Sequence, residues 1–316
     1  MLIASILLGA LAVILAWPVP VLLAGARWQS RSPAVALVLW QSIALAGGLS
    51  MIGALLTFGL APFGDDLVGS VAALVTAAGG TGGVPGELQF WHLLALAGAV
   101  LLGGHLLLNL VITVLRSEAQ RRRHAQLVSL LSSPMEHSPG ARILDTPAPV
   151  AYCLPGPFRS ITVLSAGLVS LLDAGELEAV IEHERGHLSQ RHDIVLILFR
   201  AWHASLPWFP IAYGAQLQVA RLVEMLADDR ARRVVDDATL ARAIALTGTA
   251  VPAVAESAVR QVGGPEPGTL LEVTERIRRL ERLPNPLPRA ANGAIIAAAV
   301  ALIAVPTALL VAPALA

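Results

Sequence analysis

The sequence predicts an α-helical membrane protein with four transmembrane helices and one α+β domain on the cytoplasmic side. Hydrophobic residues make up 55% of the 316 residues and charged residues only 14%, which is far from the composition of soluble domains. The mean hydropathy is correspondingly high, at +0.69. Four windows hold about 20 or more apolar residues each, the length that a helix needs to cross a bilayer. These windows are Leu2 to Leu23, Ala34 to Leu60, Trp91 to Leu115 and Ala294 to Ala316.

The predicted spans divide the chain into three parts. Three spans with an outer loop at 61–90 make up residues 1–115, and the fourth span makes up residues 291–316. The first window has no basic start, and its apolar run is too long for a signal peptide, so we expect it to be retained. Residues 116–290 have mixed charge and turn signals over a length that suffices for one compact domain.

The arginines set the expected orientation. All 22 basic residues are arginine, because the chain contains no lysine. They follow the first and third spans and precede the fourth, whereas the loop at 61–90 has acidic residues and no basic one. Because cytoplasmic loops carry an excess of positive charge, we expect a multi-pass cell-membrane protein with its N-terminus outside and its domain in the cytoplasm. The arginines concerned are Arg27, Arg31, Arg116, Arg121, Arg122, Arg123 and Arg289.

Two further features bear on partners and compartment. The arginine clusters are interleaved with no aromatic residues that stack on bases, so we expect them to contact the lipid bilayer and no nucleic acid directly. The single cysteine, Cys153, has no partner for an internal disulfide, which agrees with a reducing cytoplasm. We interpret Cys153 as a packed core thiol.

A His-Glu-x-x-His pattern at His183, Glu184 and His187 indicates chemistry in the central domain. Four residues apart on a helix, the two imidazoles lie on one face and can hold one zinc ion, with Glu184 beside them. That carboxylate is then placed to take a proton from a water on the zinc, as in metalloproteases. Two solvated histidines on an amphipathic helix are the alternative reading.

A catalytic zinc ion needs a third protein ligand and an open position. Glu224 is preferred, because it begins Glu-Met-Leu-Ala-Asp on a second expected helix and Asp228 lies one turn further on the same face. Asp228 is then expected to accept a hydrogen bond from a ligand imidazole. An acidic face opposed to nearby arginines is the alternative. The full set of candidate ligands is His192, His203, Glu224, Asp228 and Asp229.

Residue patterns place the motif after a small sheet. Val150 to Leu154 and Ile161 to Leu164 are short and apolar, so they predict a hairpin or two neighbouring strands, whereas Pro134 to Pro149 is interpreted as a connector. Asp173, followed three residues later by a glutamate, predicts a capping box at the start of a helix over Ala174 to Gln190.

Two other apolar segments are too short or too interrupted to be spans. We expect Ile194 to Tyr213 to form a helix buried in the domain or lying on the membrane surface, broken at Pro207 and Pro210, with a fifth span as the alternative. In the outer loop, Val71 to Ala78 is expected to form a small helix, with a ligand or stress sensor as the alternative.

Five motifs then occur in an order that resembles BlaR/MecR-type membrane zinc metallopeptidases, over roughly Arg142 to Arg289 together with the four-span plan. They are Ala151-Tyr152-Cys153-Leu154-Pro155-Gly156, Leu172-Asp173 with Glu176-Leu177, His183-Glu184-Arg185-Gly186-His187, Leu206-Pro207-Trp208-Phe209-Pro210 and Glu224-Met225-Leu226-Ala227-Asp228. The related CAAX-protease and heat-shock membrane peptidases share the zinc parts. The resemblance implies a gluzincin-like fold, in which His183, His187 and Glu224 bind one Zn²⁺ ion, Glu184 is the catalytic base and Asp228 supports a ligand.

The resemblance also implies a function. Sensors of that family carry a penicillin-binding domain that needs a lysine, and this chain has none, so we expect the short form of the family without that sensor. The substrate would be a cytoplasmic regulator, either a BlaI-type transcriptional repressor or the protein itself, and a homo-oligomer is possible. Quality-control peptidases of the heat-shock type and a non-catalytic, zinc-stabilised signalling subunit are the alternatives. His203, Tyr213 and Arg230 are the candidates for stabilising the transition state.

Overall fold

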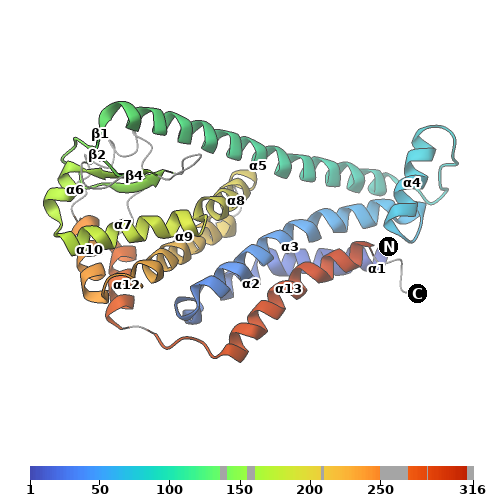
Figure 1. Cartoon of the computed structure of the whole chain (residues 1–316). Coiled ribbons are helices and arrows are strands. Elements are labelled where there is room, and N and C mark those ends of the chain that lie inside the picture. The colour runs from blue at the N-terminus through green and yellow to red at the C-terminus, as the bar shows by residue number, and fades with distance from the viewer. Residues whose placement is uncertain (136–140, 155–160, 208–209, 250–269, 283, 312–316) are drawn as a thin grey trace. The chain divides into compact units, whose positions relative to one another are not determined.

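The computed structural model describes residues 1–135, 141–154, 161–207, 210–249, 270–282 and 284–311 (Figure 1). The chain divides into two compact units, which are treated separately below. The helical unit comprises Met1–Leu110, Ala201–Gln216 and Leu287–Ala316. The mixed unit comprises Val111–Arg200 and Leu217–Pro286.

The helical unit contains the long apolar helices that the composition predicts. Among the described residues, four helical stretches are long and apolar enough to cross a membrane, and these are Leu2–Ala24, Pro33–Phe63, Phe90–Leu131 and Arg289–Val311. A membrane protein with several long apolar helices is thus supported, while the number of crossings and the orientation remain predictions. The elements are α1 (Leu2–Ala16), α2 (Pro18–Ala24), α3 (Pro33–Leu60), α4 (Leu67–Ala78), the first part of α5 (Phe90–Leu131) and α13 (Arg289–Val311), with 3₁₀ turns at Arg27–Arg31 and Ala61–Phe63.

Helix α3 packs against both α1 and α13, and glycines allow the close approach. A Cβ added at Gly53 would lie 3.1 Å from Leu310 Cδ2 and 3.2 Å from Leu8 Cδ1. Small residues at helix contacts let apolar helices pack closely where the hydrophobic effect between helices is weak. One buried polar contact ties α3 to the turn before it: Trp40 Nε1 donates to Gln29 Oε1 over 2.8 Å.

The segment after the zinc motif is broken where its prolines predict. Helix α8 (His192–Ser205) ends before Pro207, and α9 (Pro210–Ala231) begins at the second proline. The part of this segment within Ala201–Gln216 clusters with the helical unit. There Trp202 lies against Gly48, where an added Cβ would be 3.0 Å from the indole ring. The loop helix predicted before the third span is also present, as α4.

The mixed unit contains a four-stranded sheet in the order β1-β2-β4-β3. The two predicted neighbouring strands are confirmed, as β3 (Ala151–Leu154) and β4 (Ile161–Ser165) pair antiparallel, with Cys153 opposite Thr162. The interpretation of Pro134 to Pro149 as a connector alone was wrong. Part of it forms β2 (Ala141–Leu144), which pairs parallel with β4 and antiparallel with β1 (Ser132–Pro134). Strand β3 lies at one edge of the described sheet.

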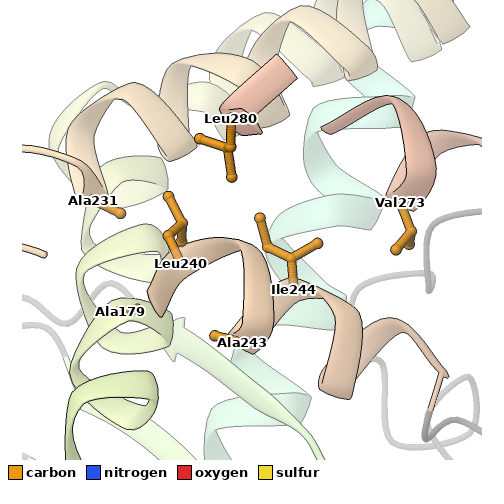
Figure 2. Packing of buried hydrophobic residues seen from close by; sticks show 7 residues of the cluster. All are labelled: Ala179, Ala231, Leu240, Ala243, Ile244, Val273 and Leu280. Atoms are coloured by element: carbon orange, nitrogen blue, oxygen red, sulfur yellow. The ribbon is translucent and has the colours of Figure 1, made fainter. Parts of the chain in front are cut away.

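Helices pack around one another beside this sheet and bury an apolar core (Figure 2). The core cluster joins side chains from four helices, namely Ala179, Ala231, Leu240, Ala243, Ile244, Val273 and Leu280. Those helices are α7 (Ala174–Ser189), α9, α10 (Asp237–Thr249) and α12 (Leu270–Glu281), and the short α6 (Ala166–Leu171) follows β4. Burial of this kind contributes about 25 cal/mol per Å² of apolar surface, so the core fixes how α7, α9 and α12 lie relative to each other.

Candidate metal centre

The start of helix α7, which carries the motif, is fixed by its own sequence. The predicted capping box is confirmed: Asp173 Oδ1 accepts from the Glu176 backbone N–H over 2.8 Å, and Glu176 Oε2 accepts from the Asp173 N–H over 3.0 Å. Such a cap satisfies donors that the first helical turn leaves unpaired. Two turns further on, His183 and His187 lie on one face of α7.

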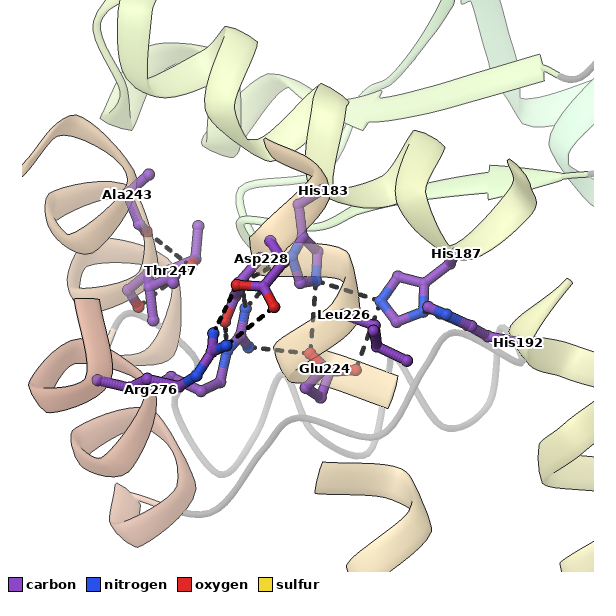
Figure 3. A network of polar contacts seen from close by, with 12 residues as sticks. His183, His187, His192, Glu224, Leu226, Asp228, Ala243, Thr247 and Arg276 are labelled. Atoms are coloured by element: carbon purple, nitrogen blue, oxygen red, sulfur yellow. Dashed lines mark hydrogen bonds and ion pairs between the residues drawn. The ribbon is translucent and has the colours of Figure 1, made fainter. Parts of the chain in front are cut away.

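Three candidate ligand side chains converge between α7 and α9 (Figure 3). The two Nε2 atoms of His183 and His187 are 3.2 Å apart. Glu224 reaches both rings, with Oε2 3.4 Å from His183 Nε2 and Oε1 3.4 Å from His187 Nε2. One ligand atom from each of the three residues lies within 4.8 Å of the others. The carboxylate therefore completes a compact set of two nitrogens and one oxygen.

Gly186, between the two histidines, sets the separation of the two helices. A Cβ at this position would lie 3.1 Å from Ala227 Cα and 3.3 Å from Arg230 Cβ, both on α9. A side chain here would push against the backbone of α9. The glycine therefore brings α9 close enough for Glu224 to meet the rings carried by α7.

The second acidic residue of α9 supports the first histidine. Asp228 Oδ1 lies 2.9 Å from His183 Nδ1, and the aspartate is 1% exposed. Because the carboxylate accepts the proton on Nδ1, the neutral form of His183, which a metal ion requires, has its lone pair on Nε2, which faces Glu224 and His187. This is the arrangement expected for Asp228 from the spacing of the two acidic residues.

Arg276 enters the site from α12, and the sequence analysis did not single it out. Its Nε and Nη2 lie 2.8 and 2.6 Å from the two carboxylate oxygens of Asp228, and its Nη1 lies 3.0 Å from Glu224 Oε2. Figure 3 shows the guanidinium reaching between the two carboxylates. A bidentate pair of this kind offsets the cost of burying Asp228. The sequence of α12 contains several arginines and indicates a charged helix, but it does not distinguish Arg276 from the others.

Glu184 has the electrostatics of a proton acceptor that works near neutral pH. Burial raises the pKa of its carboxyl to about 7, with the nearby Glu224 charge acting in the same direction and His183 and Arg276 opposing it. The carboxylate also accepts a hydrogen bond from the backbone of Cys153 in β3. Glu184 is thereby held between the ligand helix and the edge of the sheet.

The two candidate histidine ligands differ in their electrostatics. Burial and the charge on His183 lower the pKa of His187 to about 3, so His187 is neutral. Burial also lowers the pKa of His183, but its hydrogen bonds to Asp228 and Glu224 outweigh this and raise it to about 9. Burial opposes ionisation of Glu224, yet the neighbouring His183 and Arg276 hold the pKa of that carboxyl below its usual value.

The donor set fits a zinc ion. Zinc prefers four-coordinate tetrahedral geometry with bonds of roughly 2.0–2.1 Å to nitrogen, which places neighbouring ligand atoms about 3.3 Å apart. The three separations of 3.2, 3.4 and 3.4 Å match that spacing. Two imidazoles and one carboxylate leave a fourth position, as in catalytic rather than structural sites.

The other candidate residues lie elsewhere. Asp229 pairs with Arg279 over 2.8 and 2.9 Å, and His192 contacts His187 on the far side of its ring, so neither joins the three-residue set. Arg230 belongs to α9 in the mixed unit. His203 and Tyr213 belong to the helical unit, where their rings are 5.4 Å apart. Trp208 and Phe209, as well as Pro155 and Gly156, lie outside the described residues.

Comparison with protein families agrees with this geometry. Residues 116–257 match the model of peptidase family M48. The match covers β1 to β4 and the helices that carry the two histidines and Glu224, and it points to a protease domain of a generally zinc-dependent family. No curated protein and no solved structure matches the chain. Helix α12, which supplies Arg276, follows the matched residues.

Proposed function

We propose that the chain is an integral-membrane zinc endopeptidase that cleaves a cytoplasmic regulator, either a BlaI-type repressor or the protein itself. The observation that carries the enzymatic part is the meeting of His183, His187 and Glu224 beside the partly buried acid Glu184. A zinc site with three protein ligands, an open position and a base of pKa about 7 has the parts that peptide hydrolysis needs.

In the proposed mechanism each side chain has one task. Bound zinc would supply Lewis acidity, which polarises the scissile carbonyl and makes water more acidic. Glu184 takes a proton from the attacking water and passes it to the leaving amine, and its raised pKa suits both transfers. Arg276 neutralises negative charge beside the ligands, because its Nη1 lies 3.0 Å from Glu224 Oε2. It is therefore a further candidate for the second electrophile.

The edge of the sheet offers a place for the substrate backbone. Strand β3 is paired on one side only within the described sheet, and it packs beside α7. An extended peptide added to that edge would form main-chain hydrogen bonds and pass the base, because Glu184 is bonded to the backbone of Cys153. Recognition through the main chain suits an extended or locally unfolded segment.

A quality-control peptidase of the heat-shock type is the second candidate. The match of residues 116–257 to family M48 is equally compatible with it. A non-catalytic zinc-stabilised subunit is the third candidate. The set of three ligand side chains found among the described residues disfavours it, because structural zinc sites are closed by four protein ligands.

Substitution of the base separates these possibilities. Glu184→Gln in the full chain is expected to keep one bound zinc ion and to lose peptide hydrolysis by at least about 100-fold, because only the proton transfer is removed. Metal content and peptide cleavage by the purified protein are the measurements. Full cleavage by the Glu184→Gln protein would defeat the proposal. Glu178→Gln, an exposed change on the same helix, is the matched control and should leave metal content and peptide cleavage unchanged.

The substrate class requires a cellular measurement. Proteins that accumulate in cells with the Glu184→Gln form, compared with cells that hold the active form, should include one transcriptional repressor or the full-length chain itself. Accumulation of many unrelated membrane proteins would instead support the quality-control function.

A further inference from the structure

A chain of polar side chains leads away from His187 through the turn between α7 and α8. His187 Nδ1 lies 3.0 Å from His192 Nδ1, and His192 Nε2 lies 3.0 Å from Gln190 Oε1. Gln190 Nε2 in turn donates to the Leu226 backbone carbonyl on α9 over 3.5 Å. Figure 3 shows His192 against His187, on the side of that ring away from His183.

The Leu226 carbonyl, at the end of this series of contacts, determines the direction of every hydrogen bond in the series. A backbone carbonyl only accepts, so Gln190 presents its NH₂ group to Leu226 and turns its oxygen towards His192. That oxygen accepts the proton on His192 Nε2, which leaves the lone pair of a neutral His192 on Nδ1. His187 then donates from its own Nδ1, and its lone pair stays on Nε2, which faces His183 and Glu224.

The backbone is shaped to make this contact. Arg191, between the two side chains, has φ +50°, a left-handed conformation that costs a non-glycine residue about 1 kcal/mol. This turn ends α7 and starts α8 at His192, so both Gln190 and His192 return to the last turn of α7. His192 is 2% exposed, and a buried imidazole needs partners for its polar atoms.

We propose that His192 is a positioning residue, which holds His187 in the tautomer and orientation that allow its Nε2 to bind a zinc ion. The inference rests on the proposed zinc function. In this role His192 supports His187 in the way that Asp228 supports His183. His183 is oriented by the Asp228 carboxylate of α9. His187 is oriented by the neutral imidazole of His192, whose tautomer is set, through Gln190, by the Leu226 carbonyl of α9.

The test compares two replacements of His192 in the purified full chain. His192→Phe keeps a buried ring and removes the acceptor, whereas His192→Asn loses volume and places an oxygen where Nδ1 lies. Zinc affinity is measured by competition with a chromophoric chelator, with Zn²⁺ alone as the probe. His192→Phe is expected to bind zinc 10- to 100-fold more weakly, and His192→Asn to stay within about threefold of the unaltered chain.

Controls separate this role from packing. His124→Phe replaces another buried histidine of the mixed unit and should leave zinc affinity unchanged. Gln190→Leu alters an exposed side chain, so folding is preserved, and it should weaken zinc binding in the same direction by a smaller factor. With Co²⁺ in place of zinc, His192→Phe should change the visible absorption bands and His192→Asn should retain them.

The possible results are distinct. Undiminished zinc affinity in both His192→Phe and Gln190→Leu would overturn the positioning role and leave the proposed enzyme intact. An equal loss in the Asn and Phe variants would also overturn it, because packing would then explain the effect. Failure of the unaltered chain to bind zinc would overturn both proposals.

Discussion

Arg276 joins two carboxylates that have different tasks at the candidate metal centre. It contacts Asp228, which holds His183, and Glu224, which is itself a candidate ligand. With Asp228 1% exposed, its negative charge has no access to water and depends on this guanidinium. The arginine therefore stabilises the fold and the ligand geometry through the same contacts.

Removal of this charge should destabilise the mixed unit. Arg276→Gln leaves Asp228 buried without its partner, so we expect a loss of about 3 kcal/mol in the free energy of unfolding. Arg276→Lys should recover only part of this loss, because an ammonium group cannot form the bidentate pair. Urea unfolding followed by circular dichroism measures both. Arg278→Gln, an exposed change on the same helix, serves as control, and a cost equal to that of Arg276→Gln would contradict the assignment.

Spacing in the sequence sufficed to predict which side chains gather from α7 and α9. His183 and His187 are one turn apart, as are Glu224 and Asp228, and one helical period places each pair on one face. Arg276 could not be found in this way, because it lies 48 residues from Asp228 and is one of several arginines on α12. The contact between His192 and His187 depends on a positive φ at Arg191, which no residue preference indicates.

At the scale of elements, the contact of α7 with α9 decides whether the ligands meet. Gly186 permits this contact, as an added Cβ would be 3.1 Å from Ala227 Cα. In the sheet, β2 went unrecognised because prolines occur on both sides of it and its parallel pairing with β4 is not local. The antiparallel pair β3 and β4, by contrast, is evident from two short apolar runs close in sequence.

A methyl group at Gly186 should therefore separate the two helices. Gly186→Ala is expected to cost about 1–3 kcal/mol in the free energy of unfolding through overpacking, and to weaken zinc binding by moving Glu224 away from the rings. Thermal unfolding and chelator competition measure the two effects. Gly175→Ala on the same helix is the control, because its Cβ would meet nothing closer than 3.5 Å. If Gly186→Ala binds zinc normally, the glycine does not set the ligand spacing.

At the scale of the whole molecule, the single cysteine makes the proposed orientation easy to test. Burial raises the pKa of the Cys153 thiol to about 11, so it is mostly protonated at neutral pH and reacts slowly with maleimides. The unaltered chain should thus give little labelling background. Cysteines introduced at exposed positions then report their own side of the membrane.

We expect Gly83→Cys, in the loop predicted to lie outside, to react with a membrane-impermeant maleimide in intact cells. Glu178→Cys, on α7, should react only after the membrane is disrupted, because the domain is predicted to be cytoplasmic. Both positions are exposed. Mass shift of the purified chain measures the labelling, and the opposite pattern would reverse the predicted orientation.

The position of α12 along the chain has a practical consequence for dissecting the protein. The residues matched to family M48 end at 257, whereas Arg276 comes later. A polypeptide trimmed to the matched segment would keep every proposed zinc-binding side chain and lose the cation that neutralises Asp228. Such a fragment is expected to be poorly soluble, and adding α12 back as a separate peptide should restore its fold.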